Sequence, residues 1–390
     1  MNYGKLMSSE LQDIQPSGIR KFFSLAEEIE GCISLGVGQP DFVTPWEIRR
    51  AGIESLERGK TWYTGNAGLI ELRNQISDYL DRKFNVRYDP KSEVVVTVGG
   101  SEAIDIAMRA VINPGDEVII PSPCFVCYEP IARMCGANVV PLVLKEENDF
   151  RIVPRELKEA ITEKTKLLVL PFPANPTGAI LDRNDLQKIA EILVGTDIFV
   201  LSDEIYAELT YGGVKHVSYA SVSRDAWERT IYVGGFSKSY AMTGWRLGYV
   251  CAPAPLAKQI VKLHQYTIMC APTMAQYGGI VAMRDCDEDV EMMRNEYDSR
   301  RRYMVDAFNR MGLSCFEPKG AFYCFPSIKS TGMTSEEFCE KLLRSKKIAV
   351  VPGNAFGPGG EGYIRVSYCY SLKHLKKAIA GIEAFIHELD

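Results

Sequence analysis

The chain has 390 residues, of which 46% are hydrophobic and 24% are charged, and its formal net charge at pH 7 is -5. This length exceeds what one small hydrophobic core serves, so we expect two domains. The acidic balance argues against a nucleic-acid partner, and no apolar run approaches the ~18 residues that span a bilayer.

The first part of the chain, residues 1–45, is irregular and too short to form a domain. We expect it to be an arm that packs on the smaller domain or on a partner chain. Its first residues, MNYGKLMSSELQDIQ, lack the charged and then apolar pattern of a signal peptide, so we expect a cytoplasmic protein.

From about residue 90, short β-rich runs alternate with amphipathic helices. The run EVVVTV predicts a strand that is buried on both faces. Further apolar runs predict strands at 118–120, 166–172, 198–203 and 230–235. Helices are predicted at 101–112 and 182–193, and Asp182 is a plausible N-cap of the second helix. This alternation predicts an α/β domain over residues 46–284, with a mainly parallel central sheet.

The texture of the sequence changes at about residue 285, where a long charged helix begins. GAFYCFP follows this helix, and then come a further helix, KIAVVPG, GYIRVSY and a last helix. We expect these elements to form a smaller α+β domain over residues 285–390.

Polar groups follow several of the predicted strands at the point where each strand ends. In an open α/β sheet, the functional site lies beyond the carboxyl ends of the strands. The groups in these positions are the glycine pair Gly99 and Gly100 with Ser101 and Glu102, then Asn175, Asp203, Tyr206, Ser237 and Lys238.

The glycine pair stands at a predicted helix start, where free backbone N–H groups and the helix dipole favour an anion. Ser237 and Arg246 can add a hydroxyl and a guanidinium, which are usual partners of a phosphate. The alternative is a tight turn between strand and helix that binds nothing.

Asp203 ends a buried strand, where a carboxylate needs a cationic or hydrogen-bonding partner. It can pair with a protonated ring nitrogen, or it can cap a helix formed by EIYAEL. Lys238 stands among Phe236, Tyr240 and Met242. Desolvation and the nearby Arg246 would lower its pKa and make it nucleophilic, and the alternative is a solvated loop lysine.

A phosphate cup, a carboxylate for a ring nitrogen and a Schiff-base lysine are the three demands of pyridoxal 5'-phosphate (PLP). The chain resembles the class I/II aminotransferases, which are PLP enzymes of fold type I, like aspartate aminotransferase. Six motifs over about residues 31–370 carry the resemblance, and they are SLGVGQPDF, VGGSEAI, ANPTG, SDEIY, SKSYAMTGWRLG and YIRVSY.

The resemblance implies catalytic roles for Lys238, Asp203 and Tyr206. Lys238 would bind PLP covalently and move the proton of the substrate, and Asp203 would keep the pyridine nitrogen protonated. Tyr206 and Asn175 would hydrogen-bond the phenolic oxygen of the cofactor. Phe125 would stack on the ring, at a position where the family more often has Tyr or Trp. The phosphate would be held by the backbone of Gly100, Ser101 and Glu102 and by Ser237 and Arg246.

The resemblance also implies how the substrate binds. Arg365 would hold the α-carboxylate in a bidentate fork, with help from Gly38 and Asn175. Without the resemblance, Arg365 could instead be a strand-edge arginine that is paired with Glu361 or another acid. Tyr63 matches a tyrosine that reaches the phosphate of the neighbouring subunit, which implies a homodimer.

The implied activity is transamination from an L-amino acid to a 2-oxo acid, with 2-oxoglutarate as the expected acceptor, by a two-stage exchange through pyridoxamine phosphate. A C–S β-lyase or decarboxylase on the same scaffold is one alternative, although lyase relatives tend to carry a histidine where this chain has Tyr206. A non-catalytic PLP-binding regulator is another alternative. Such regulators usually carry a DNA-binding domain, and no basic recognition helix precedes residue 31.

Two features stay open at this point. A dicarboxylate substrate needs a second cation, for which the candidates are Arg20, Lys21, Arg300, Arg301 and Arg302. The eleven cysteines are odd in number and irregularly spaced, which favours reduced thiols. Cys124 and Cys127 have the CxxC spacing without a second pair or nearby histidines, so we expect pocket or core thiols and no metal site.

Overall fold

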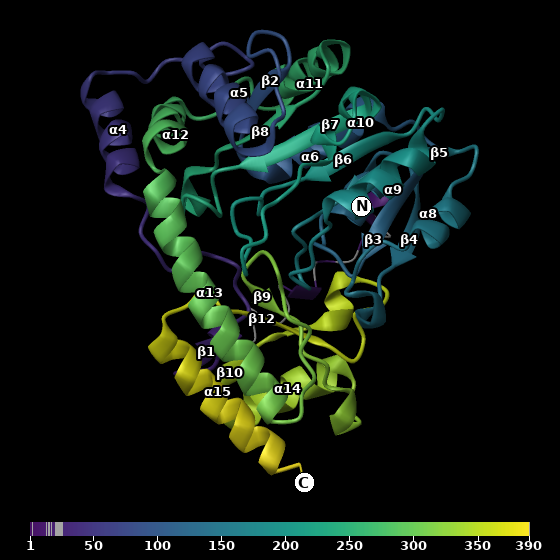
Figure 1. Cartoon of the computed structure of the whole chain (residues 1–390), viewed down its shortest axis with the longest axis vertical. Helices are drawn as coiled ribbons and strands as arrows, with labels where there is room; N and C mark the ends of the chain where they lie inside the picture. Colours follow the sequence, from purple (N-terminus) through teal and green to yellow (C-terminus); the bar gives the residue numbers. More distant parts are fainter. Residues whose placement is uncertain (2, 13, 15, 17, 20–25, 390) are drawn as a thin grey trace.

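The computed structural model describes residues 1, 3–12, 14, 16, 18, 19 and 26–389. A seven-stranded sheet forms the upper layer of the molecule in Figure 1. Its strands in spatial order are β2 (Val94–Thr97), β8 (Gly248–Cys251), β7 (Thr230–Gly235), β6 (Phe199–Asp203), β5 (Thr165–Leu170), β3 (Glu117–Ser122) and β4 (Asn138–Val143). Strand β8 runs antiparallel to both of its neighbours, and every other neighbouring pair is parallel. The predicted mainly parallel α/β sheet is therefore confirmed.

Helices cover both faces of this sheet, so its inner strands are buried along most of their length and are mainly apolar. Side chains alternate between the faces of a strand, so Val94 and Val96 belong to one core cluster and Val95 belongs to another. The core of Val95 is shared with helices α6 (Gly99–Val111), α7 (Tyr128–Met134) and α11 (Ala254–Thr267). The core of the other two valines is shared with α5 (Ile70–Phe84) and α12 (Thr273–Asp285).

Helix α9 (Arg183–Leu193) begins where the sequence predicts. The side chain of Asp182 accepts a hydrogen bond from the backbone N–H of Asp185, at 2.9 Å, and the Asp185 side chain accepts from the N–H of Asp182, at 3.1 Å. These two bonds form a capping box, so the predicted N-cap is confirmed.

The lower layer contains a three-stranded antiparallel sheet and three long helices (Figure 1). Its strands are β11 (Val351–Pro352), β12 (Ile364–Ser367) and β9 (Tyr323–Cys324), and its helices are α13 (Asp287–Arg310), α14 (Ser335–Lys346) and α15 (Leu372–His387). Helix α13 runs from the upper layer down along the lower one. We propose that the large domain, residues 46–284, gives way to the small domain, 285–390, just before this helix.

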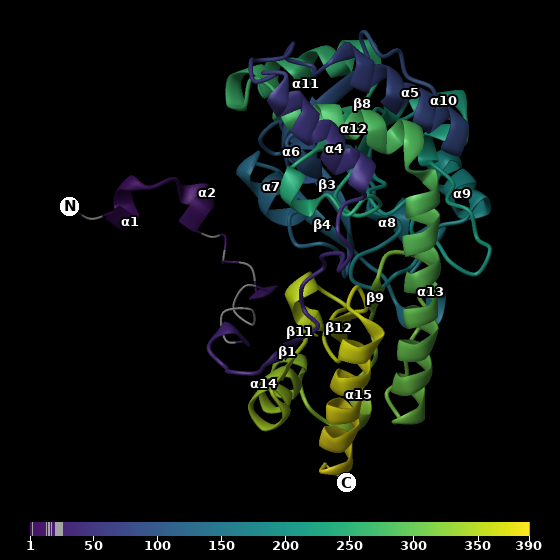
Figure 2. The same cartoon turned by 90° about the vertical axis from the view of Figure 1, so that its left-hand side faces the viewer.

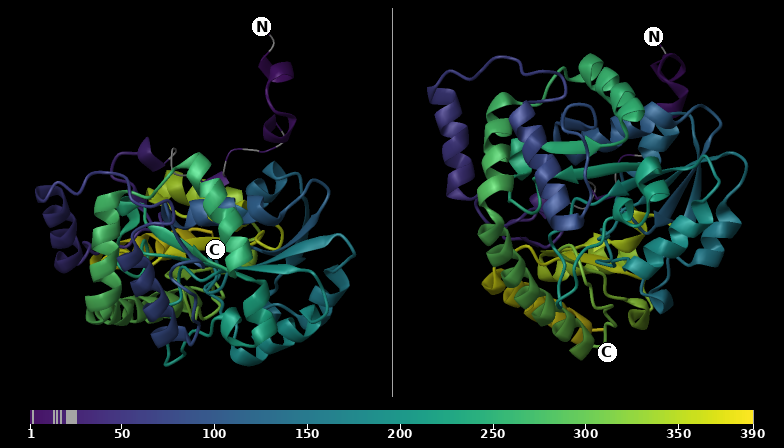
Figure 3. Two further views of the ribbon diagram at one scale, coloured as in Figure 1. Left: turned by 90° about the horizontal axis from the view of Figure 1, so that it is seen from above. Right: turned by 45° about the horizontal axis from the view of Figure 1, so that its top comes forward.

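The N-terminal part of the chain begins outside the lower layer and joins it at strand β1 (Ile33–Ser34). Strand β1 pairs in parallel with β10 (Ile348–Ala349). Helix α1 (Tyr3–Leu6) projects from the body of the molecule, as Figure 2 and Figure 3 show, whereas α2 (Ser9–Gln12) approaches α7 of the upper layer. We propose that residues 1–45 are an arm that packs partly on the small domain and partly on a partner chain.

The remaining helices are short or lie at the periphery. They are α4 (Trp46–Glu57), α8 (Pro154–Ala160), α10 (Arg224–Arg229) and the 3-10 turns η1 (Glu146–Asn148), η2 (Tyr219–Ser221), η3 (Thr243–Trp245), η4 (Lys329–Thr331) and η5 (Gly353–Phe356). In the ranges that the structure describes, no helix combines the length and the apolar character that crossing a membrane requires.

Candidate active site

A cavity of about 340 Å³ lies between the two layers, at the carboxyl ends of the parallel strands. This volume is typical of a small-molecule site. Most of the residues that the sequence predicts for the site line the cavity, namely Gly38, Gly100, Ser101, Phe125, Asn175, Asp203, Tyr206, Ser237, Lys238, Arg246 and Arg365. The structure therefore brings these predicted residues to one place.

The parallel sheet explains why these residues meet. Strand β5 leads to Asn175, β6 ends at Asp203 and β7 leads to Lys238, and these strands run in the same direction. Their carboxyl ends therefore share one edge of the sheet. Arg365 comes from β12 in the lower layer, so residues of both layers line the cavity.

Lys238 lies at the floor of the cavity. Its Nζ donates a hydrogen bond to the carbonyl oxygen of Gly38 at 2.8 Å and lies 5.8 Å from the centre of the Phe322 ring. The pKa of Lys238 is lowered to about 8, chiefly by burial and also by the charges of Arg365 and Arg246, while Cys369 and Asp203 oppose the shift. The side chain is thus not a solvated loop lysine.

Asp203 is a buried carboxylate with two donors. The hydroxyl of Tyr128 donates to its Oδ2 at 2.6 Å, and the backbone N–H of Ile205 donates to its Oδ1 at 3.2 Å. Burial raises the pKa of Asp203 to about 6, and both hydrogen bonds oppose this rise. The chain after Asp203 forms a turn rather than a helix, so the N-cap alternative is wrong.

The start of helix α6 forms the anion-binding part of the site. The backbone N–H groups of its first turn have no partner within the helix. Gly99 has a φ of +79°, and a Cβ at this residue would lie 2.6 Å from Nη2 of Arg246. Glycine therefore lets the guanidinium lie against the helix N-terminus, where an anion would meet both.

Glu102 is one of two predicted residues that do not line the cavity. Its carboxylate accepts from the N–H of Val98 at 2.5 Å and pairs with Nδ1 of His264 at 2.6 Å. Its side chain thus fixes the turn before α6. Tyr63 is the other residue, and its side chain is 76% exposed outside the cavity.

Arg365 is buried and is held by neutral groups. Its Nη1 donates to Oδ1 of Asn175 at 3.0 Å, and its Nη2 donates to the carbonyl oxygen of Gly36. Among the described residues, nothing accepts a hydrogen bond from its Nε. Glu361 accepts instead from the N–H of Ser335 at 2.7 Å, so the alternative of an Arg365–Glu361 pair is wrong.

Two tyrosines belong to the site although the sequence analysis did not single them out. Tyr128 contacts Asp203, and the hydroxyl of Tyr323 lies 3.0 Å from that of Tyr206. Tyr128 could have been suspected because it stands three positions after Phe125. Nothing in the sequence connects Tyr323 with Tyr206, which lies 117 positions away.

Three of the candidate cations for a second carboxylate, Arg300, Arg301 and Arg302, do not line the cavity. Arg300 is bonded to Asp41 and Glu296, Arg301 is bonded to Glu317 and Asp298, and Arg302 is paired with Asp298. Arg20 and Lys21 lie outside the described residues.

The cysteines are free thiols, all eleven of them. Burial raises the pKa of the Cys124 and Cys127 thiols, which disfavours the thiolate that metal binding and disulfide exchange require. The part of the chain that the structure describes contains no group of three or more side chains suited to hold a metal ion.

The donor set of the cavity fits PLP. Ser237, Arg246 and the N-terminus of α6 suit a phosphate, Asp203 suits a protonated ring nitrogen, and Lys238 supplies an amine with a lowered pKa. The fold and the site together thus define a PLP-dependent enzyme of fold type I.

Comparison with known proteins identifies the family. The family model described as aminotransferase class I and II matches residues 30–382, and the chain belongs to this family. It is 45% identical over 384 residues to an aspartate aminotransferase of Pyrococcus abyssi, with 98% of each chain covered. It is 42% identical over 384 residues to aromatic-amino-acid aminotransferase 2 of Thermococcus litoralis, again with 98% of each chain covered.

A solved structure supports the same assignment. The aspartate aminotransferase of Thermus thermophilus with maleate matches with a TM-score of 0.92 and 34% identity, covering 97% of this chain and 99% of that one. Enzymes of this family and fold use PLP, so the protein is a PLP-dependent aminotransferase.

Proposed function

We propose that the protein transfers the amino group of an L-amino acid to 2-oxoglutarate in two successive half-reactions at this cavity. The observation that carries the proposal is that one cavity joins the amine of Lys238, the carboxylate of Asp203 and the guanidinium of Arg365. An amino acid needs a group for its carboxylate and a base for its α-proton, which Arg365 and Lys238 supply, and Asp203 supplies the partner that the ring nitrogen of PLP requires.

We propose that the residues around PLP divide its groups among them. Asp203 would pair with the ring nitrogen, Tyr206 and Asn175 would donate to the phenolic oxygen, and Phe125 would stack on the ring. Ser237, Arg246 and the backbone of 100–102 bind the phosphate. When bound, PLP draws electrons from the α-carbon of the amino acid and so weakens its C–H bond.

Lys238 is the group that we propose moves the proton. Its pKa of about 8 leaves a useful fraction of neutral amine near neutral pH, and the carbonyl of Gly38 holds Nζ at 2.8 Å. Arg365 holds the substrate carboxylate, because its Nε is free to donate and its guanidinium is planar.

A dicarboxylate acceptor requires one more cation. Among the described residues, the charged side chains that line the cavity are Asp203, Lys238, Arg246 and Arg365, and each already has a proposed role. We therefore propose that Arg20, Lys21 or a partner subunit supplies the cation for the second carboxylate of 2-oxoglutarate.

We also propose that the active unit is a homodimer with Tyr63 donated across the interface. Large apolar side chains are exposed on α4 and on the segments 62–66 and 266–273. These two segments lie side by side, because Asn66 Nδ2 donates to the carbonyl oxygen of Met269 and the Thr273 hydroxyl donates to that of Trp62. The exposed side chains are Trp46, Ile53, Leu56, Trp62, Tyr63, Tyr266, Ile268 and Met269. Such a patch is typical of an interface between chains.

The cytoplasmic location stays a prediction.

The test is a panel of amino acids added singly to the holoenzyme, scored by the single-turnover loss of visible absorption and by amino transfer to 2-oxoglutarate. Borohydride should first fix the chromophore on the peptide that contains Lys238, with Lys238→Ala as the control. Label on another lysine, or full turnover by Lys238→Ala, would overturn the proposed role. Ammonia released without a new amino acid would instead indicate a lyase.

A further inference from the structure

Tyr323 enters the cavity from β9 of the lower layer and lies against three groups of the site. Its hydroxyl lies 3.0 Å from the hydroxyl of Tyr206. A Cβ at Gly38 would overlap the same hydroxyl, so the glycine makes room for it. Burial raises the pKa of Tyr323 to about 12 and that of Tyr206 well above its usual range. Both side chains therefore keep their protons at neutral pH.

The ring of Tyr323 supports Arg365. The guanidinium carbon lies 4.5 Å from the centre of this ring and 4.8 Å from the centre of the Phe356 ring. Two aromatic faces thus hold the guanidinium by cation–π attraction. Phe356 resembles Tyr323 only in its ring contact with Arg365. The hydroxyl of Tyr206 lies against Tyr323 and not against Phe356.

The hydroxyl pair has a preferred direction once Tyr206 donates its proton to an acceptor in the cavity. Only the proton of Tyr323 is then left to fill the 3.0 Å gap between the two oxygens. A hydroxyl that accepts a hydrogen bond becomes a better donor, because the two bonds polarise each other.

We propose that Tyr323 is a positioning residue, whose hydroxyl strengthens Tyr206 as a donor to the phenolic oxygen of the cofactor while its ring aligns Arg365 for the substrate carboxylate. This inference rests on the proposed function, which assigns Tyr206 and Arg365 their roles. It assigns two separable jobs to one side chain, so the hydroxyl and the ring can be tested apart.

The hydroxyl is tested by pH titration of the visible absorption of the holoenzyme of the wild type, Tyr323→Phe, Tyr206→Phe and the double variant. A hydrogen bond donated to the phenolic oxygen stabilises the anionic form of that oxygen. Weaker donation therefore raises the pH at the midpoint of the absorption titration. Strengthening of a hydrogen bond to a charged group by about 10–30% corresponds to a rise of about 0.1 to 0.6 of a pH unit in Tyr323→Phe. Tyr206→Phe should show a larger rise, and the double variant should show no further one.

The ring is tested by the KM for the amino acid. Tyr323→Phe keeps the ring and should leave the KM within about twofold, whereas Phe356→Leu should raise it about fivefold without moving the midpoint, since about 1 kcal/mol of cation–π attraction is lost. Tyr323→Leu should raise both the KM and the midpoint.

The outcomes separate this inference from the proposed function. A midpoint that Tyr206→Phe leaves unchanged would remove Tyr206 from the cofactor, and the inference would fall with it. A shift in Tyr206→Phe without one in Tyr323→Phe, or shifts that add in the double variant, would overturn the inference about Tyr323 alone.

Discussion

Burial shifts the titration of Lys238 and Asp203 in opposite directions. It lowers the pKa of the amine to about 8 and raises that of the carboxyl to about 6, because burial disfavours both charged forms. Shifts of this kind concentrate at functional sites, where a group must gain or lose a proton near neutral pH. Both pKa shifts have effects that can be measured on the protein without cofactor.

The first prediction concerns the attachment of PLP to the apoprotein. Only the neutral amine of Lys238 attacks a carbonyl, so the rate of attachment should rise with pH and level off above about pH 8. An ordinary lysine would keep accelerating the reaction to about pH 10. Stopped-flow absorption across this pH range measures the rate. A rise that continues past about pH 9.5 would contradict a lowered pKa, and Lys238→Ala should give no attachment at this site.

The second prediction concerns the stability of the apoprotein. The pKa of Asp203 is raised in the folded state, so its contribution to stability is present at low pH and is lost as the pH rises through about 6. The apoprotein of Asp203→Asn should therefore gain about 2 to 3 kcal/mol relative to the wild type between pH 4 and pH 7. Urea unfolding at several pH values measures the difference.

The control for this prediction is Asp306→Asn, which alters an exposed carboxylate on α13 that pairs with Arg310 at 3.1 Å. Its effect should stay below about 1 kcal/mol at every pH. An Asp203→Asn effect that is as small and as independent of pH would show that Asp203 ionises in the fold without cost.

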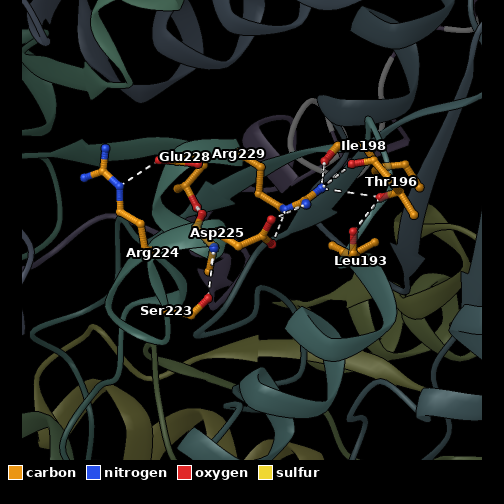
Figure 4. A network of polar contacts seen from close by, with 10 residues as sticks. Leu193, Thr196, Ile198, Ser223, Arg224, Asp225, Glu228 and Arg229 are labelled. Atoms are coloured by element: carbon orange, nitrogen blue, oxygen red, sulfur yellow. Dashed lines mark hydrogen bonds and ion pairs between the residues drawn. The ribbon is translucent and has the colours of Figure 1, made fainter.

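At the scale of elements, α10 illustrates how one buried arginine fixes a helix to the sheet. Figure 4 shows Arg229, whose Nε and Nη2 donate to the carboxylate of Asp225 at 2.9 and 2.8 Å. Its Nη1 donates to the carbonyl oxygens of Ile198 at 2.8 Å and Thr196 at 3.1 Å. These contacts tie the end of α10 to the segment that leads into β6, and so to Asp203.

The third prediction compares two arginines of this helix. Arg229→Met leaves buried carbonyl groups without a donor and should lower the free energy of unfolding by about 2 to 3 kcal/mol. Arg224→Met removes an exposed pair with Glu228, at 2.7 Å, and a cation–π contact with Trp227, at 4.4 Å, and should cost about 1 kcal/mol or less. Urea unfolding of the two holoenzymes gives the comparison, and equal losses would show that the Arg229 network contributes no more than a surface pair.

At the scale of the whole molecule, the site is built from two layers and, in our proposal, from two chains. Arg365 and Tyr323 come from the lower layer, whereas Lys238 and Asp203 come from the upper one. Tyr63 is 76% exposed and lies outside the cavity of its own chain. A role for Tyr63 at the phosphate therefore requires a second copy.

The fourth prediction tests this requirement by mixing Tyr63→Asp with Lys238→Ala, each of which should be nearly inactive alone. If Tyr63 acts on the neighbouring chain, one site of a heterodimer carries both lesions and the other carries none. Activity should then return to about a quarter of the wild-type value, because random mixing makes half of the dimers heterodimers with one intact site. Isotope-labelled chains and native mass spectrometry verify that heterodimers are present. An inactive mixture that contains them would restrict Tyr63 to its own subunit.

The sequence by itself determined the class of fold and most of the residues that meet at the cavity. Hydrophobic runs and helix signals such as Asp182 are local features, and they predicted the parallel sheet and the start of α9. Because the carboxyl ends of parallel strands share one edge, the order of strands and polar residues along the chain is enough to group Asn175, Asp203 and Lys238 at one site.

Only the tertiary structure decided which groups contact one another within the site. In the structure, Tyr128 donates to Asp203, and the hydroxyls of Tyr323 and Tyr206 lie against each other. Arg365 donates to Asn175 and does not pair with Glu361. Strand β8 runs antiparallel to its neighbours β2 and β7, and β1 near the start of the chain pairs with β10 near its end. The physical reason is that periodicity and capping act over a few residues, whereas these contacts join segments that only the packing of the two layers brings together.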